Sequence, residues 1–179
     1  MKAVAVVAHP DDCVIFAWPF IEAHPEFEWH IVYLTYTHYQ PRGKEVDEYW
    51  KKRNITAIFL GYDDVWESVK KGQTGFNTEQ ATQELGNISS AYDFILTHNA
   101  DGDYGHVHHK LVHQAVVNLD IPKVYFASTF NYNTKYTVQT AVDVNELPLH
   151  KKVIEEFRDR NTGLYIVTPE AELLLKKNK

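Results

Sequence analysis

The sequence predicts an α/β fold, a doubly wound and mostly parallel sheet with helices on both faces. Short uncharged runs rich in β-branched residues recur along the chain, beginning at residues 4–7, and such runs are typical of strands buried on both faces. Segments with helical spacing of apolar residues separate them. This alternation favours parallel strands joined by helical crossovers. At 179 residues, the chain fits a single domain, residues 1–179.

The first half of the chain contains three expected strands and three expected helices. Pro25 prevents the first helix from continuing, Gly61 closes the third strand, and Asn77 caps the third helix. In order, the expected elements are a strand at 2–8, a helix at 14–22, a strand at 29–35, a helix at 44–53, a strand at 56–60 and a helix from 77 to about 85.

The second half continues the alternation as far as a fifth strand. Tyr136, Val138, Thr140 and Val142 alternate along 135–144, which predicts a half-exposed strand at an edge or in antiparallel orientation. In order, the expected elements are a strand at 93–97, a helix beginning near 106, strands at 123–128 and 135–144, an amphipathic helix at 146–160 and a segment at 166–174 that trails off into a basic tail.

The composition argues against several classes of partner and compartment. A net charge of −6 disfavours a nucleic-acid backbone as partner, because that binding needs a basic face. No run approaches bilayer length and no signal peptide is evident, so we expect a soluble, cytoplasmic protein without a membrane partner. The single cysteine, Cys13, excludes an intramolecular disulfide. We expect it to pack at the start of a helix, with a role as a soft metal ligand as the alternative.

A polar cluster, Ala8-His9-Pro10-Asp11-Asp12, follows the first expected strand. Ligands of open α/β sheets bind at the carboxyl ends of the strands. Two carboxylates and an imidazole within four positions repel or are costly to bury, and a divalent cation removes both penalties. The residues therefore favour a metal site with His9 and Asp12 as ligands and Asp11 as the base for a bound water. A helix N-cap is the alternative, but it explains only one aspartate.

Four histidines lie within eight positions after the fourth expected strand: His106, His108, His109 and His113. They fall at the same carboxyl edge of the expected sheet, so the two polar stretches can converge on one crevice. His109 and His113 have the one-turn spacing that aligns two imidazoles on a helix face, and His106 and His109 share a face at the helix start. The residues alone leave open which histidines complete the metal site.

The two stretches together resemble the motifs of the LmbE-like, or PIG-L, family of zinc-dependent N-deacetylases. The first motif of that family is A-H-P-D-D, and the second is a G-H-x-x-H at a helix start, which residues 105–109 match. Arg42 and Glu45 match an R-x-x-E pair, and residues 60–64 are similar to an L-G-Y-P-D-G turn. The resemblance covers roughly the first two thirds of the chain. From about residue 130 the chain diverges from the family.

This resemblance implies a Rossmann-like fold and a metal centre. His9, Asp12 and His109 match the ligands of the family's Zn²⁺, for which Fe²⁺ is the alternative ion. Asp11 matches the carboxylate that activates the metal-bound water. His113 has no counterpart in the motif, so we place it at the helix surface or behind the ligands.

The resemblance also implies further site residues and a substrate class. His106 matches a histidine that stabilises or protonates the tetrahedral intermediate, Tyr104 a tyrosine that helps to polarise the carbonyl, and Arg42 an arginine that contacts substrate. The family removes acetyl groups from amino sugars and their conjugates. We therefore expect a hydrolase that removes an acetyl or similar acyl group from the amine of an N-acetyl amino sugar or glycoconjugate. The sequence leaves open whether the chain forms a homo-oligomer.

The chain departs from the family pattern at two motif positions and in its length. Cys13 stands where glutamate is usual, and His108 stands where the second motif carries aspartate, which is expected to alter the protonation of His106. The family's H-x-S-Q-like feature is not evident, and the chain is short. The alternative function is a catalytically impaired metal- and sugar-binding module of the same fold. A nucleotide-binding protein is disfavoured, because no G-x-G-x-x-G or Walker-type loop follows the first strand.

Overall fold

The computed structural model describes residues 1–64, 76–127, 136–139, 143–157 and 162–177. The strands are β1 (Lys2–Val7), β2 (Glu28–Thr35), β3 (Thr56–Tyr62), β4 (Phe94–Thr97), β5 (Lys123–Phe126), β6 (Tyr136–Gln139) and β7 (Thr162–Val167). The helices are α1 (Pro10–Asp12), α2 (Trp18–Ala23), α3 (Pro41–Lys51), α5 (Thr78–Ser89), α6 (Val107–Val116), α7 (Lys151–Phe157) and α8 (Pro169–Lys177). A π-helical turn, Cys13–Ala17, joins α1 to α2, and a 3-10 turn spans Val144–Glu146. No helix in these ranges is long and apolar enough to cross a membrane.

The strands form one sheet in the order β3-β2-β1-β4-β5-β7-β6. Strands β1 to β5 are parallel, and β1 lies between β2 and β4, where Ala5 is paired with both Ile31 and Leu96. Strands β7 and β6 extend the β5 side in antiparallel orientation. The predicted fold class is confirmed. The described part of the strand expected at 135–144 is β6, which is both antiparallel and at the edge.

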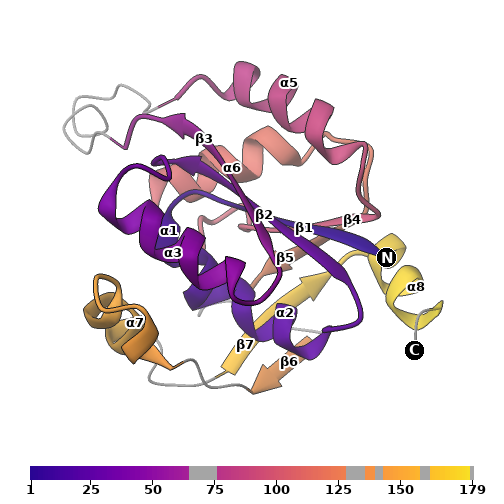
Figure 1. Ribbon diagram of the computed structural model, residues 1–179. Coiled ribbons are helices and arrows are strands. Elements are labelled where there is room, and N and C mark those ends of the chain that lie inside the picture. The colour runs from indigo at the N-terminus through magenta and orange to yellow at the C-terminus, as the bar shows by residue number, and fades with distance from the viewer. Residues whose placement is uncertain (65–75, 128–135, 140–142, 158–161, 178–179) are drawn as a thin grey trace.

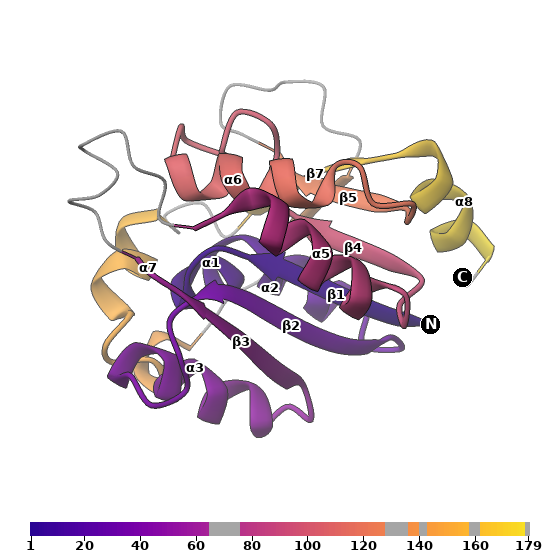
Figure 2. The ribbon, with the colours of Figure 1, turned by 90° about the horizontal axis from the view of Figure 1, so that it is seen from above.

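Helices cover both faces of the sheet, with α5 and α6 on one face and α2 and α3 on the other (Figure 1; Figure 2). Successive side chains of a strand point to opposite faces, so β1 contributes to two apolar cores. Val4 and Val6 belong to the core beneath α5 and α6. Ala5 and Val7 belong to the core on the other face. This two-sided burial explains why β1 is uncharged along residues 3–7.

Two prolines move helix starts toward the N-terminus from their expected positions. The first helical segment begins at Pro10 instead of residue 14, and α3 begins at Pro41 instead of residue 44. Proline is favoured in the first helical turn because its missing N–H has no intrahelical acceptor there. The first helical segment therefore starts inside the polar cluster and places Asp12 in its first turn.

The C-terminal part differs most from expectation. Helix α7 begins at Lys151, not at 146, because Pro148 disfavours helical backbone at Leu147, which has φ −130° and ψ 59°. Strand β7 was not predicted, and helix α8 occupies the region expected to be a tail, so that expectation is wrong. The expected ends at residues 128 and 160 lie outside the described residues.

Replacement of Leu96 tests the position of the core. Leu96 is fully buried on β4, so Leu96→Ala should lower the free energy of unfolding by about 2–5 kcal/mol through lost contacts and a residual cavity. Leu173 on α8 is exposed, and Leu173→Ala should change the same quantity by less than about 0.5 kcal/mol. Urea unfolding followed by circular dichroism measures both. Similar losses for the two variants would contradict the assigned core.

Candidate active site

The candidate site lies at the carboxyl ends of β1 and β4. The chain leaves β1 for β2 and β3 and returns to β4 on the other side of β1, so this is the point where the sheet order reverses and where ligands of open α/β sheets bind. His9 follows β1, His98 follows β4, and α6 begins nearby at Val107. The two polar stretches singled out in the sequence thus meet at one edge.

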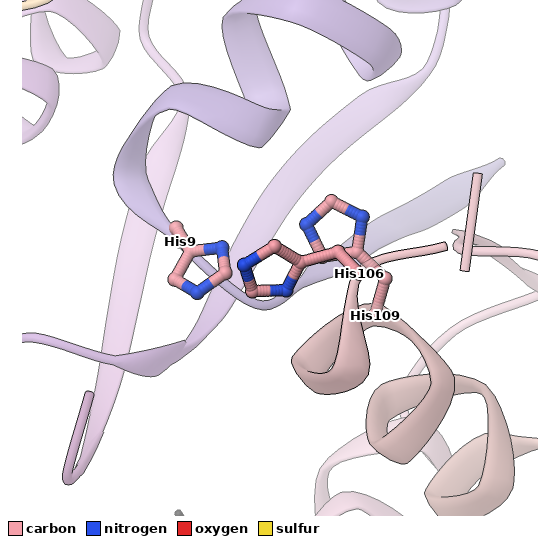
Figure 3. A group of neighbouring side chains, drawn as sticks. All are labelled: His9, His106 and His109. Atoms are coloured by element: carbon pink, nitrogen blue, oxygen red, sulfur yellow. The ribbon is translucent and has the colours of Figure 1, made fainter. Parts of the chain in front are cut away.

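The imidazoles of His9 and His109 each approach one oxygen of the Asp12 carboxylate. His9 Nδ1 is 3.1 Å from Asp12 Oδ2, and His109 Nε2 is 3.1 Å from Asp12 Oδ1. The His9 ring comes from the loop after β1, and the rings of His106 and His109 come from the start of α6 (Figure 3). The backbone N–H of His9 also donates to Asp12 Oδ2 at 2.7 Å, so Asp12 caps helix α1 as well.

The surroundings of His109 fit a bound cation. Its Nε2 is buried and makes no hydrogen bond, although Asp12 Oδ1 is 3.1 Å away. A buried nitrogen left without a partner is costly, and a cation at its lone pair removes that cost. Two imidazoles and one carboxylate form a ligand set that zinc accepts, with one position left for water or substrate. In the described residues, donor atoms within 4.8 Å of one another group His9 with His106 and His109, and Asp12 with His98 and His109. Each implied ligand thus belongs to a group that could hold a metal ion, and the set His9, Asp12 and His109 stays a prediction.

Asp103 fixes the orientation of His109 from behind. Its Oδ2 is 2.8 Å from His109 Nδ1 and also hydrogen-bonds His98 Nδ1. Although burial opposes ionisation, the His98 and His109 imidazoles lower the pKa of Asp103 below its ordinary value. With Nδ1 held by Asp103, Nε2 is the ring nitrogen that faces Asp12, and a carboxylate in this place is typical behind metal-bound histidines. Sequence reasoning missed Asp103, although it lies in the polar stretch after β4.

The loop that carries Asp103 is held by Asn99 and by a glycine. Asn99 Oδ1 accepts the backbone N–H groups of Asp101 and Asp103 at 2.9 and 3.1 Å. Gly102 has φ +70°, and a Cβ there would lie 2.6 Å from the His106 carbonyl oxygen. A side chain at residue 102 would therefore be strained and crowded. The turn needs glycine to bring Asp103 under the histidines.

His106 caps α6 and faces His9 and His109. Its Nδ1 accepts the backbone N–H of His108 at 3.2 Å, and its ring centroid lies 4.8 Å from that of His9 and 4.6 Å from that of His109. Burial and the imidazoles of His109 and His9 lower the pKa of His106 to about 3. His106 is therefore a neutral imidazole, and because its Nδ1 accepts a hydrogen bond, its proton is on Nε2.

Tyr104 lies at the exposed rim of the histidine group. Its ring stacks on Phe16 with centroids 6.3 Å apart, and its centroid is 5.2 Å from that of His109. The side chain is partly exposed. Partial burial raises the pKa of Tyr104, so its phenol keeps its proton at neutral pH.

Asp11 is engaged by Arg42, which is itself held by residues from elsewhere in the chain. Arg42 Nη2 is 2.9 Å from Asp11 Oδ1, Arg42 Nη1 donates to Tyr36 Oη at 3.2 Å, and Arg42 Nε donates to His150 Nε2 at 3.4 Å. His150 is fully buried, and its Nδ1 hydrogen-bonds Glu45. The divergent C-terminal part thus contributes His150 to this network. No local pattern in the sequence distinguished that histidine.

Cys13 and His113 lie outside the candidate metal group. Cys13 is buried in a core, its thiol contacts the Tyr33 hydroxyl, and burial raises the pKa of the thiol. The expectation that it packs at a helix start is confirmed. His113 Nδ1 is 3.1 Å from the His98 backbone oxygen, which places it behind the ligands. Neither residue belongs to a group of metal-capable side chains in the described ranges.

Comparison with known proteins decides the family. Residues 4–119 match the family model described as PIG-L, GlcNAc-PI de-N-acetylase. The chain belongs to the PIG-L family. An uncharacterized protein of Acanthamoeba polyphaga mimivirus is 25% identical over 145 residues, which cover 72% of this chain and 61% of the viral protein. This PIG-L chain therefore spans less than two thirds of the length of that relative.

Two solved structures share the fold of this PIG-L chain. The zinc-inhibited form of the teicoplanin deacetylase Orf2 has a TM-score of 0.58 at 11% identity, with 88% of this chain and 84% of that chain covered. The 4-carboxy-2-hydroxymuconate hydratase of Pseudomonas putida has a TM-score of 0.57 at 16% identity, with 89% and 80% covered. These structures have different activities, so the shared fold does not by itself define the reaction.

The role of Asp103 can be tested through metal affinity. Asp103→Asn removes the negative charge behind His109, and loss of such a partner typically weakens metal binding by about 10–100-fold. Asp101→Asn is the matched control, because Asp101 lies in the same loop but is exposed. Competition with a chromophoric chelator measures Zn²⁺ affinity, and thermal unfolding checks the fold. Unchanged affinity in a folded Asp103→Asn protein would show that Asp103 does not orient a ligand.

Proposed function

We propose that this protein is a metal-dependent deacetylase that hydrolyses the amide of an N-acetylated amino sugar or glycoconjugate to acetate and a free amine. The observation that carries the proposal is the buried His9–Asp12–His109 group with the Asp11 carboxylate beside it. Membership of the PIG-L family supports a deacetylase-type hydrolase. The teicoplanin deacetylase fold neighbour is consistent with a small acylated substrate.

His9, Asp12 and His109 would hold Zn²⁺, with Fe²⁺ as the alternative. When bound, the ion would polarise the amide carbonyl and lower the pKa of a coordinated water to about 7. The three side chains are buried, and Asp12 stands between the two imidazoles. In this proposal Asp11 is not a ligand, and its carboxylate is paired with Arg42.

Asp11 is the proposed general base. Arg42 engages its Oδ1 at 2.9 Å, so Oδ2 is the oxygen that takes a proton from the attacking water. The water oxygen then bonds to the acyl carbon, and the C–N bond breaks as the amine leaves. Asp11 returns the proton to the leaving amine, because His106 is a neutral imidazole whose Nδ1 already accepts a backbone N–H.

His106 and Tyr104 are the proposed donors to the negative charge that develops on the acyl oxygen. His106 offers Nε2–H, and Tyr104 offers a phenol that stays protonated because its pKa is raised by burial. Removal of one donor of this kind typically costs about 10²–10³-fold in kcat. The resemblance implies that His106 and Tyr104 act on the carbonyl or the intermediate. The proposal keeps these roles and specifies that His106 acts as a hydrogen-bond donor.

The general-base role can be tested with Asp11→Asn. A screen of amine release from N-acetylated sugars by the metal-loaded protein supplies the assay. Asp11→Asn should retain the metal and lose about 10²–10⁴-fold in kcat, because the amide cannot accept the proton. Asp120→Asn, an exposed control, should keep wild-type kcat. Undiminished hydrolysis by Asp11→Asn excludes this base, and sugar binding without turnover by the wild-type protein favours an impaired binding module.

Arg42 was expected to contact substrate, whereas its contacts here support a role in positioning Asp11. Arg42→Lys loses the fork that joins Asp11, Tyr36 and His150, and a small displacement of the base can lower kcat by up to about 100-fold. A substrate-binding role instead predicts a higher KM at unchanged kcat. Arg53→Lys is the matched control, because Arg53 lies just beyond the C-terminal end of α3 and pairs with Glu146. Steady-state kinetics separates the two roles.

A further inference from the structure

Three donor atoms form a triangle at the Nε2 edge of the His9 ring, opposite the Nδ1 edge that faces Asp12. His9 Nε2 is 3.0 Å from His108 Nδ1 and 3.5 Å from Asp64 Oδ1, and His108 Nδ1 is 3.2 Å from Asp64 Oδ1. His108 is fully buried, and the side chain of Asp64 is partly exposed. His9 thus faces Asp12 with Nδ1 and this triangle with Nε2.

While Asp64 is ionised, hydrogen bonds alone leave at least one edge of the triangle unfavourable. If only His9 Nε2 carries a proton, lone pairs of His108 and Asp64 face each other. If only His108 Nδ1 carries a proton, lone pairs of His9 and Asp64 do so. If both nitrogens are protonated, two N–H groups meet at 3.0 Å. A cation bound by all three lone pairs makes every edge favourable.

We propose that His9 Nε2, His108 Nδ1 and Asp64 Oδ1 form a second divalent-cation site that shares His9 with the site at Asp12. Zinc bonds of 2.0–2.1 Å in tetrahedral geometry place two ligand atoms about 3.3–3.4 Å apart, which is within the range of the three edges. Two imidazole nitrogens and one carboxylate oxygen suit Zn²⁺, Co²⁺ or Fe²⁺. With both sites filled, His9 would contribute Nδ1 to one and Nε2 to the other, and the proton displaced from the ring would pass to solvent.

His108 makes this site specific to the present chain. It occupies the position where the chain departs from the G-H-x-D-H form of the second motif, and it supplies the imidazole that the triangle needs. Asp64 follows β3, two residues beyond Tyr62, so a third strand end contributes to the edge. The inference rests on the proposed function only in that His9 is common to both sites.

Metal stoichiometry of the full chain tests the second site. Protein stripped with a chelator is dialysed against increasing Zn²⁺, and bound zinc is measured by elemental analysis. The wild-type protein should bind two equivalents. In Asp64→Asn the second equivalent should bind at least about tenfold more weakly, since loss of even an indirect partner costs about 10–100-fold. Asp63→Asn, the exposed neighbour, should bind two equivalents as the wild type does.

A second variant and a separate assay keep the outcomes distinct. His108→Phe preserves an aromatic ring and should also lose the second equivalent, and circular dichroism checks its fold. One equivalent in the wild-type protein, or two tight equivalents in Asp64→Asn, would overturn the second site. Either result would leave the proposed hydrolase intact. Two equivalents without amine release from any N-acetylated sugar would instead refute the proposed function and support the second site.

Discussion

The Asp12 carboxylate between two buried imidazoles is the interaction on which the rest of the site depends. Burial opposes ionisation of Asp12, but the His109 and His9 imidazoles hold the pKa of its carboxyl well below the usual value. A buried charge of this kind is tolerated only while its partners remain, and removal of one partner typically costs about 3–5 kcal/mol. The fold must therefore keep the loop after β1 and the start of α6 in fixed register.

The sheet supplies that register through hydrogen bonds at the strand ends. The hydroxyl of Thr97 at the end of β4 donates to the Val6 carbonyl at 2.8 Å, and the hydroxyl of Thr35 at the end of β2 donates to the Ala8 carbonyl at 2.6 Å. Both accepting carbonyls lie within three residues of His9, one in β1 and one directly after it. The backbone N–H of Ala8 then donates to His98 Nε2. Strand ends that lie far apart in sequence are thus connected directly below the histidines.

A structural feature could be predicted from the sequence when neighbouring residues determine it, and not when contacts between distant residues do. The buried strands were recognisable because their apolar runs are short and uncharged, and His9, Asp11 and Asp12 were recognisable because three chemically costly residues stand in four positions. Strand β7 was missed although residues 164–167 form a similar short uncharged run. It departs from the parallel alternation, because it pairs antiparallel with β5, which lies far away in sequence. The assignment of residues 1–179 to one domain stays a prediction.

The supporting residues were harder to predict because their partners are distant. Asp64, Asp103 and His150 look like ordinary polar residues in their own segments. Their structural roles are defined by contacts with His108, His109 and Arg42, respectively. The contact between His150 and Arg42 spans 108 positions. The motif residues thus show where a site is, whereas the groups that orient them become visible only when the strand ends are brought together.

Arg42 also accounts for the different roles proposed for Asp11 and Asp12. The two carboxylates are adjacent, and with His9 they form one of the groups that can hold a metal ion, so composition alone does not separate a ligand from a base. Asp12 faces two imidazoles in the interior, whereas Asp11 gives one oxygen to a guanidinium. The positive charge of Arg42 offsets the repulsion between the carboxylates and competes with a cation for Asp11. Because Glu45 holds His150, and His150 contacts Arg42, a segment outside the family match helps to fix the position of Asp11, the proposed base.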